Sequence, residues 1–472
     1  MRPQAEFLRV LSDANLLDVM GRLDAVSLAR FGAVNLRLYT LSHTAGLWRD
    51  LTLKDKCGNF RFCGSWRETY TGHGHAQLDR SLASVRPATF LDVEPRWLER
   101  SNIERRSVDE LSIEEFIEKY EKPGVPVILT GAVPSWPAAT EWTQNRLLER
   151  FPEQLFRVSA TVDMRLKDYF AYCNNCKGDE RALYLFDKDF CTKCPEMASE
   201  FTIPKYFQQD LMGVLGEHRR PDYKWLIIGP ALSGSSFHVD PNCNFAWNAT
   251  IQGRKKWVMY PPGVPPPLSS EQDRQVSLLQ WFHEQYDDDD NVDVRLECVT
   301  EGGECMYVPR GWWHCVLNLD LCIAITHNVV TTQNLLPAIR FLERCEPCAP
   351  GQGCRGVTKI NFSGDVPTSV IFPYKNHVEQ AAKADALFHM SATCECSAKQ
   401  LQLLHDFKEA LERSMPGALE RILADHAAKQ AAAASPWTKL GLMPGETTEA
   451  APFSFNFAID AEAADEGEED RT

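Results

Sequence analysis

Two short segments far apart in the chain restrict its fold more than any other feature. Residues 236–241 read Ser-Phe-His-Val-Asp-Pro, and residues 311–314 read Gly-Trp-Trp-His before an apolar run. Side chains two positions apart in a strand point to the same face, so a strand here lets His238 and Asp240 reach one point. A second strand carrying His314 adds a third ligand. The pattern predicts a β-rich fold around a metal site.

The ligand types indicate which metal this site holds. Two imidazoles and one carboxylate suit non-haem iron(II), because they leave positions open for a bidentate cosubstrate and oxygen. Closed cysteine-rich zinc sites lack those positions. A His-x-Asp tripeptide alone is a weak signal. The alternative without metal binding is a surface turn or a pair of hydrogen-bonded core histidines. The apolar surroundings of His314 favour ligation, since an unbonded polar ring there costs stability.

A lysine at the start of a later strand fits the cosubstrate of such a site. A dicarboxylate such as 2-oxoglutarate, chelating through one end, needs a cation for its far carboxylate inside a poorly solvated barrel. Lys255 follows the stretch 244–251 and a turn at Gln252-Gly253, so we expect it to begin a strand antiparallel to the one near His238 and Asp240. Exposure to solvent is the alternative, because lysines at strand starts are more often exposed than buried.

Short strands alternate with turns and small helices from about Ser112 to Val330. Ser112 caps a helix that Pro123 stops, and a buried strand follows at 124–131. Near the other end, Thr326 and Asn328 share the parity of His314. They face the same interior if a turn at residues 318–320 does not break the register.

Three short stretches between Phe7 and Leu53 repeat apolar residues at helical spacing and predict three small helices. The stretch closes on Leu47-Trp48-Arg49-Asp50-Leu51, and the whole segment resembles an F-box. The resemblance implies docking on the adaptor subunit of a cullin-type ubiquitin ligase, with Leu11, Leu16 and Leu17 as contacts. A helical hairpin that merely covers the core is the alternative.

The C-terminal part returns to helical periodicity. Helices are expected at 378–388 and at 399–423, the second broken at Pro416-Gly417. Its apolar stripe of Leu401, Leu404, Phe407, Leu411 and Leu419 could pack on the core or pair with a second copy as a homodimer. The last part is alanine-rich and then acidic, with too little apolar surface to offset ordering entropy, which predicts disorder.

Longer motifs from about Ser107 to Val330 resemble the jumonji-C (JmjC) oxygenases. They include RRPDYKWLIIGPALSGSSFHVDP at 219–241, AWNATIQGRKKW at 246–257 and VPRGWWHCVLNLDLCIAITHN at 308–328. The similarity is closest to the bifunctional arginine demethylase and lysyl-hydroxylase group, once called the phosphatidylserine receptor. It implies a fold of mixed α and β class with a double-stranded β-helix, the cupin-like jelly roll, as its core.

The resemblance also implies roles for particular residues. Iron(II) is ligated by His238, Asp240 and His314, and 2-oxoglutarate is the cosubstrate. Lys255 pairs with its far carboxylate, helped by Asn248, Thr326 and Tyr184, while Ser235 stands where the group has a threonine. The implied activity is a dioxygenase that hydroxylates lysine side chains or demethylates N-methylated arginine or lysine in proteins, with succinate and carbon dioxide as products.

These observations divide the chain into five parts. We predict an F-box-like helical domain at 1–70, a connector at 71–100, the JmjC oxygenase domain at 101–335, a C-terminal helical region at 336–432 and a largely disordered acidic tail at 433–472.

Paired cysteines suggest a second metal. Cys173, Cys176, Cys191 and Cys194 form two Cys-x-x-Cys pairs whose spacing suits a structural zinc site around Tyr184, against the alternative of reduced thiols. A second group, Cys345, Cys348, Cys354, Cys394 and Cys396, is more irregular. The acidic run at 287–290 reads as a solvated loop, with attraction of basic substrate tails as the sharper alternative.

The formal net charge of −15 argues against general binding of nucleic acid or anionic lipid. The first residues lack the apolar run of a secretory signal, and no stretch is long and apolar enough to span a membrane. We therefore expect an intracellular protein, in the nucleus rather than the cytoplasm, that acts on protein substrates with basic side chains. Two other functions stay open: a non-catalytic substrate receptor of a ubiquitin ligase, and a cupin with oxygen-independent chemistry.

Overall fold

The computed structural model describes residues 11–72, 92–159, 162–176, 179, 182–267, 278–287, 289–343 and 395–433. Residues up to Pro416 form one compact unit, and residues from Gly417 onward form another. The helix predicted at 378–388, the tail beyond residue 433 and most of the predicted connector lie outside the described residues. No helix in the described part is long and apolar enough to cross a membrane.

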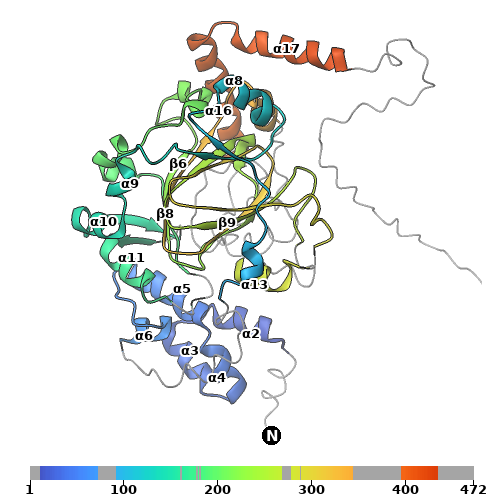
Figure 1. Cartoon of the computed structure of the whole chain (residues 1–472). Helices are drawn as coiled ribbons and strands as arrows, with labels where there is room; N and C mark the ends of the chain where they lie inside the picture. The colour runs from blue at the N-terminus through green and yellow to red at the C-terminus, as the bar shows by residue number, and fades with distance from the viewer. Residues whose placement is uncertain are drawn as a thin grey trace, which may run out of the picture. The chain divides into compact units, whose positions relative to one another are not determined.

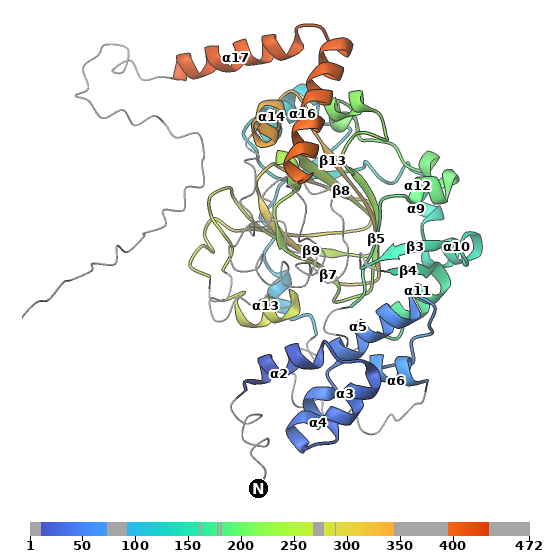
Figure 2. The same cartoon turned by 180° about the vertical axis from the view of Figure 1, so that it is seen from behind.

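Two β-sheets form the centre of the first unit (Figures 1 and 2). The larger has nine strands in the order β1 (Arg105–Ser107), β2 (Val127–Thr130), β11 (Cys305–Val308), β8 (Phe245–Gln252), β13 (Cys322–Val329), β6 (Lys224–Gly229), β5 (Leu185–Asp187), β3 (Leu155–Val158) and β4 (Val162–Arg165). The smaller has four in the order β10 (Leu296–Thr300), β9 (Lys255–Tyr260), β12 (Trp313–Asn318) and β7 (Gly234–His238).

The chain passes back and forth between these sheets, as in a cupin-like jelly roll. β6, β8, β11 and β13 lie side by side in the larger sheet, while β7, β9, β10 and β12 make the smaller one. Neighbouring strands are antiparallel except β1 and β2. The predicted β-rich core with mixed α and β structure is confirmed.

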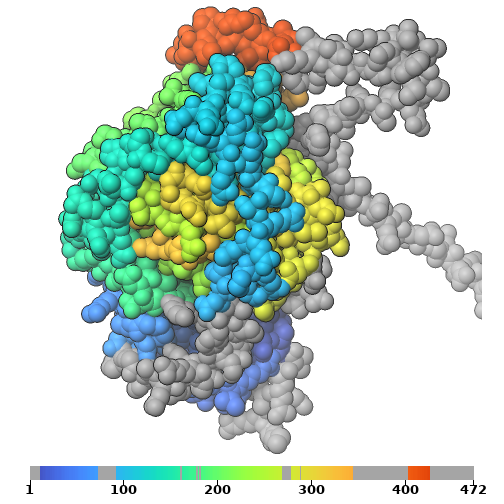
Figure 3. Space-filling model, in the orientation of Figure 1, coloured from blue at the N-terminus to red at the C-terminus, as the bar shows by residue number. Residues whose placement is uncertain are grey.

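The sequence signals before the barrel act as expected. Ser112 caps the helix α8 (Ile113–Phe116), its Oγ accepting the Glu115 backbone N–H at 3.0 Å. The helix runs on as the π-type turn η4 (Ile117–Glu121), and the buried strand β2 follows Pro123. Figure 3 shows residues 92–130, in blue to cyan, crossing one face of the first unit beside residues coloured yellow and orange.

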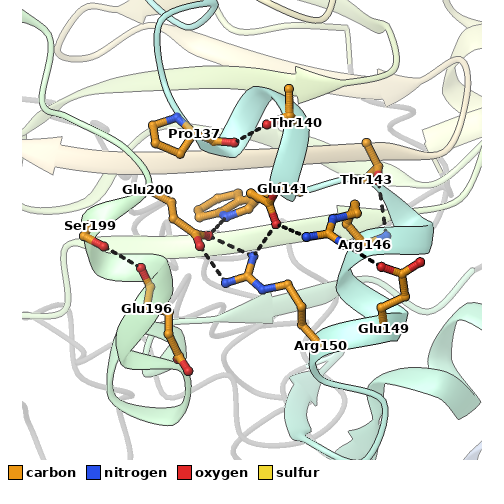
Figure 4. A network of polar contacts seen from close by, with 11 residues as sticks. Pro137, Thr140, Glu141, Thr143, Arg146, Glu149, Arg150, Glu196, Ser199 and Glu200 are labelled. Atoms are coloured by element: carbon orange, nitrogen blue, oxygen red, sulfur yellow. Dashed lines mark hydrogen bonds and ion pairs between the residues drawn. The ribbon is translucent and has the colours of Figure 1, made fainter.

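A polar network fastens the helices beside β3 and β4 to the segment before the barrel (Figure 4). It joins α9 (Ala138–Glu141) and α10 (Gln144–Arg150) to Glu200, which follows the 3-10 helix η5 (Pro195–Ser199). Arg150 pairs with Glu200 at 2.6 Å, and the Trp142 indole N–H donates to the same carboxylate at 2.7 Å. Both charged groups are largely buried, so this fork contributes more than a fully exposed pair.

In the described part of the N-terminal stretch, from residue 11 on, there are four helices where the sequence predicts three: α2 (Asp13–Met20), α3 (Ala25–Gly32), α4 (Leu36–Ser42) and α5 (Ala45–Lys56). The predicted second helix is interrupted because Asn35 caps a new one, its Oδ1 accepting the Leu38 N–H at 2.9 Å. Leu16 is fully buried in the shared core, so its predicted contact with a partner is wrong, while Leu11 and Leu17 are partly buried.

These helices, with α6 (Trp66–Thr71), pack directly on the sheet region. Phe62 meets Tyr172 edge to face with ring centroids 5.0 Å apart, and the Trp66 indole donates to Asp179 at 2.7 Å. Gly58 has φ of +79°, and a Cβ there would lie 1.9 Å from the Asp163 carbonyl oxygen. The helical segment and the barrel therefore share one core.

The C-terminal helices begin with α14 (Leu335–Glu343) and α16 (Glu395–Ser414), which lie side by side (Figure 2). Leu404, Phe407 and Leu411 of α16 are buried, and Lys408 pairs with Glu343 of α14 at 2.7 Å. These three residues of the predicted stripe therefore pack on the chain's own core, which leaves them unavailable for the predicted homodimer. The predicted break at Pro416-Gly417 is confirmed, and α17 (Ala418–Ala433) belongs to the second unit.

Candidate active site

Three side chains from two strands converge between the sheets. His238 ends β7, Asp240 follows it, and His314 lies in β12 directly opposite His238. One ligand atom from each residue lies within 4.8 Å of the others. Within the described ranges this is the one such group of histidine, cysteine or acidic side chains. The predicted convergence of two distant segments is therefore what the structure contains.

Backbone carbonyls orient both imidazoles. His238 Nδ1 lies 2.8 Å from the Ser236 carbonyl oxygen, and His314 Nδ1 lies 3.1 Å from that of Trp312. A carbonyl oxygen can only accept, so each Nδ1 carries the proton. The Nε2 lone pairs are thereby left free, which is the tautomer that a metal ligand needs.

The electrostatics of the three residues fit a divalent cation. Burial raises the pKa of Asp240 to about 6, and its Oδ2 is buried with no hydrogen-bond partner. Burial likewise lowers the pKa of His238 and of His314 to about 4, which keeps both rings neutral. Neutral imidazoles beside an uncompensated carboxylate are a donor set that an added cation stabilises.

Lys255 is the second unpartnered charge of this region. It begins β9, is 1% exposed, and makes no hydrogen bond or ion pair with any residue that the structure describes. Burial lowers the pKa of its ammonium group to about 8. The alternative of a solvent-exposed lysine is wrong. An unpaired buried cation calls for an anionic ligand, which the far carboxylate of 2-oxoglutarate supplies.

One cavity that is open to solvent brings these groups together. Its lining contains every predicted metal and cosubstrate residue: His238, Asp240, His314, Lys255, Asn248, Thr326, Tyr184, Ser235 and Asn328. The Asn248 Oδ1 is buried without a partner, so it is free to accept from a ligand. Thr326 donates to the Trp247 carbonyl at 3.1 Å, which leaves its oxygen lone pairs for a donor.

The register reasoning for Thr326 and Asn328 needs correction. They do not continue the strand of His314, because the turn after Asn318 carries the chain into the other sheet. They reach the cavity from β13, facing β12 across it. Lys255 also differs from expectation in its neighbours, since β9 pairs with β10 and β12 and is separated from β7 by β12.

Sequence reasoning missed the residues around Lys255. Asn318, taken for a turn residue, ends β12 directly opposite Lys255 and is fully buried. Its Nδ2 donates to Ser233 Oγ at 2.9 Å, and its Oδ1 has no partner. Gly229 is also needed here, because the Cβ of any larger residue would lie 2.3 Å from the Tyr184 ring and clash with it. The sequence signal for Asn318 was a polar residue that follows the apolar run Cys315-Val316-Leu317.

The four cysteines of the predicted zinc site lie in the described part of the chain, and their zinc binding stays a prediction. No three of the thiols of Cys173, Cys176, Cys191 and Cys194 lie close enough together to share an ion. Burial raises the pKa of Cys176 and of Cys194 to about 12. The Cys176 thiol donates to the Cys173 backbone carbonyl at 3.4 Å. The second cysteine group lies outside the residues whose side chains are described.

The acidic run at 287–290 is not simply a solvated loop. Asp289 is buried, accepts from the Tyr260 hydroxyl at 2.7 Å and pairs with Arg295 at 3.0 Å. Asp287 is exposed and pairs with Arg96. At least these two carboxylates therefore have structural partners, which weakens the idea that the run attracts basic substrate tails.

Comparisons with known proteins agree with this site. Residues 153–329 match the family described as "Cupin-like domain". The arginine-specific demethylase JMJ22 of Arabidopsis thaliana is 42% identical over 361 residues, covering 71% of each chain.

Two further relatives match a shorter region. The bifunctional arginine demethylase and lysyl-hydroxylase psr-1 of Caenorhabditis elegans is 35% identical, over 50% of this chain and 63% of its own length. The 2-oxoglutarate and iron-dependent oxygenase JMJD4 of Homo sapiens is 30% identical, over 50% of this chain and 63% of its own. The chain belongs to the cupin-like JmjC family of iron(II)- and 2-oxoglutarate-dependent oxygenases.

Proposed function

We propose that this oxygenase removes methyl groups from N-methylated arginine side chains of proteins. The observation that carries the proposal is the facing pair of unsatisfied groups in one cavity: the His238–Asp240–His314 set and the unpaired Lys255. The choice of methylarginine is supported by the printed names of two relatives, JMJ22 and psr-1. Hydroxylation of lysine, which the name of psr-1 also contains, is the second reaction that the same site could perform.

When bound, iron(II) and 2-oxoglutarate would use O2 to oxidise a C–H bond: one oxygen atom would enter the substrate, and the other would enter the succinate formed with carbon dioxide. The chain's own residues would hold the metal ion and orient the cosubstrate. His238, Asp240 and His314 occupy one side of the ion, and Lys255 fixes the far carboxylate of 2-oxoglutarate. An N-methyl group that gains one oxygen atom becomes a hydroxymethyl group, which leaves as formaldehyde and returns its proton to nitrogen.

The test uses the full chain with iron(II), 2-oxoglutarate, oxygen and a peptide carrying one N-methylarginine. We expect formaldehyde and succinate in equal amounts, and none of either from His238→Ala. A lysine peptide that gains one oxygen atom, with no formaldehyde from the methylated peptide, would replace demethylation by hydroxylation. Product formed without oxygen would favour an isomerase-type cupin, and no turnover with any basic peptide would favour a non-catalytic receptor.

We also propose a docking role for the N-terminal helices, in keeping with the F-box resemblance. Val26 and Val34 are each 60% exposed, and Leu36 is 78% exposed. Large apolar side chains this exposed on two neighbouring helices and the turn between them are typical of a protein-binding surface. The adaptor subunit of a cullin-type ligase should therefore co-purify with the wild-type chain and not with the double variant Val34→Asp/Leu36→Asp. Leu155→Asp, at an equally apolar exposed site on β3, is the control; loss with both variants would contradict the proposal.

A further inference from the structure

A chain of hydrogen bonds runs from the N-terminal helices to the cavity wall. The Trp66 indole N–H, in α6, donates to Asp179 at 2.7 Å, and the Tyr172 hydroxyl donates to the same carboxylate oxygen at 2.8 Å. The Tyr172 oxygen in turn accepts the backbone N–H of Leu183 at 2.8 Å. The residue after Leu183 is Tyr184, a predicted cosubstrate residue that lines the cavity.

The first part of this chain is tightly packed. Tyr172 belongs to α11 (Leu166–Cys173), which lies between the N-terminal helices and β4 in both views of the fold (Figures 1 and 2). The rings of Trp66 and Tyr172 are almost fully buried, with centroids 5.7 Å apart. Phe62 meets both rings edge to face, at 5.2 and 5.0 Å. Because water is excluded here, the hydrogen bonds within the contact are strengthened.

The backbone around Tyr184 depends on side chains of α11. Tyr184 precedes β5, so strand pairing with β6 begins only at the residue after it, Leu185. On the other side, Tyr172 accepts the Leu183 N–H, and the Tyr169 hydroxyl accepts that of Leu185 at 3.0 Å. Leu183 and Leu185 are fully buried, so a backbone N–H that lost its partner there would cost free energy. A change in α11 should therefore be felt at Tyr184.

The Tyr184 ring reaches the part of the cavity wall near Lys255. It packs against the backbone of Gly229, where an added Cβ would lie 2.3 Å from the ring and 2.4 Å from Ser233 Oγ. Ser233 Oγ accepts from Asn318, which stands opposite Lys255. A shift of the Tyr184 backbone would therefore move its hydroxyl relative to the place where the far carboxylate of 2-oxoglutarate is expected.

We propose that Trp66 and Tyr172 are positioning residues of the cosubstrate site, which hold Tyr184 where its hydroxyl meets the far carboxylate of 2-oxoglutarate. Neither Trp66 nor Tyr172 lines the cavity, so each acts through another residue. The N-terminal helices then support cosubstrate binding, in addition to the proposed docking. The inference rests on the cosubstrate role that the resemblance gives to Tyr184, and it does not depend on methylarginine as the substrate.

The first test removes one indole N–H at a time. Trp66→Phe breaks the bond to Asp179, and Trp48→Phe is the matched control, because the Trp48 indole in α5 is also buried and donates to the Ser42 carbonyl at 2.7 Å. Calorimetry on the full chain with Mn²⁺ measures the Kd of 2-oxoglutarate and of pyruvate, which lacks the far carboxylate. We expect Trp66→Phe to weaken 2-oxoglutarate binding about threefold and Trp48→Phe to leave it unchanged. Pyruvate affinity should be unchanged in both.

Two tyrosine variants show whether the effect passes through Tyr184. Tyr184→Phe should weaken 2-oxoglutarate binding about tenfold, and Tyr172→Phe, which leaves the Leu183 N–H without an acceptor, about fivefold. In the Tyr184→Phe background, Trp66→Phe should have no further effect, because the hydroxyl that it positions is gone. Thermal unfolding should show a similar fall in Tm for Trp66→Phe and Trp48→Phe, so lost stability alone would not produce the difference in affinity.

Three results would overturn the inference. The first is equal 2-oxoglutarate affinity in Trp66→Phe and Trp48→Phe, or a parallel loss of pyruvate affinity in Trp66→Phe. The second is an undiminished effect of Trp66→Phe in the Tyr184→Phe background. The third is an unchanged affinity in Tyr184→Phe, which would remove the cosubstrate role of that residue. None of these results bears on the proposed demethylation, which the formaldehyde assay tests separately.

Discussion

Two neighbouring lysines on β9 show how differently this protein treats buried charge. Lys256 points away from the cavity and pairs with Glu297 at 2.6 Å, both groups being fully buried. Glu297 also accepts from Arg295 at 2.9 Å and from the Tyr286 hydroxyl at 2.8 Å. Lys255 faces the cavity and has no such partner among the described residues. The comparison teaches that a buried charge paired with other side chains stabilises the fold, whereas a buried charge without such a partner is available to bind a ligand.

The largest effect on stability is expected at the buried Lys256–Glu297 pair, on the side of the smaller sheet that faces away from the cavity. Glu297→Gln leaves the buried Lys256 ammonium without its counter-charge, which should destabilise the protein by about 3–5 kcal/mol. Thermal unfolding of the full chain measures it. The double variant Lys256→Met/Glu297→Leu removes both charges and should recover part of the loss, because the buried Arg295 loses Glu297 but keeps Asp289. Equal destabilisation by the single and the double variant would contradict this account of the ion pair.

Removing the charge of Lys255, on the cavity side of β9, should change ligand binding and not stability. Lys255→Met should not destabilise the unliganded protein, because it removes a buried charge that has no partner. It should weaken 2-oxoglutarate binding by about 100-fold, or about 3 kcal/mol, the value of a charge-assisted hydrogen bond. Calorimetry with Mn²⁺ measures the Kd. Pyruvate lacks the far carboxylate, so its affinity should be unchanged; a parallel loss would mean that the variant disturbs the metal site.

The pH dependence of 2-oxoglutarate binding sharpens the contrast. Burial lowers the pKa of Lys255 to about 8, and only the protonated form pairs with a carboxylate. Affinity should therefore be full below about pH 8 and fall by up to about tenfold per pH unit above it in the wild type. Lys255→Met should show no such fall. The same calorimetric titration repeated from pH 6.5 to 9.5 checks this, and a wild-type affinity that is flat across the range would rule it out.

A smaller effect is expected at Asn318, which stands opposite Lys255. Asn318→Leu leaves Ser233 Oγ without its donor and removes the one polar group facing that lysine from β12. We expect about a tenfold rise in the KM for 2-oxoglutarate, the value of one hydrogen bond, with pyruvate affinity unchanged. Asn318→Asp supplies a carboxylate that competes for Lys255, so it should impair binding more. Equal KM values in all three proteins would show that Asn318 only packs.

The comparison also explains what the sequence could predict. His238 and Asp240 carry their own geometry, because two-residue spacing in a strand decides which way they point. Lys255 could be placed at a strand start from the turn before it, but its burial depends on strands that are distant in the chain. Residue spacing thus indicated the metal ligands and, among the cosubstrate residues, Lys255, Thr326 and Asn328. The resemblance was needed for Asn248, Tyr184 and Ser235.

Other features depend on contacts that no local pattern encodes. Asn318 reads as a turn residue because Leu319 and Asp320 follow it, and only the pairing of β12 with β9 shows its place. The four paired cysteines have zinc-like spacing, but the fold holds their thiols apart. Asp289 sits in an acidic run, yet Arg295 and Tyr260 bury it. In each case the deciding partner is a side chain that local spacing does not identify.

The most direct test of the central claim is an anaerobic titration of iron(II) into the full chain with 2-oxoglutarate. The visible charge-transfer absorption that arises when a 2-oxo acid chelates iron(II) reports the complex. The account predicts saturation at one iron per chain for the wild type and no band for His314→Ala or Asp240→Ala. An undiminished band in either variant, or none in the wild type, would contradict it.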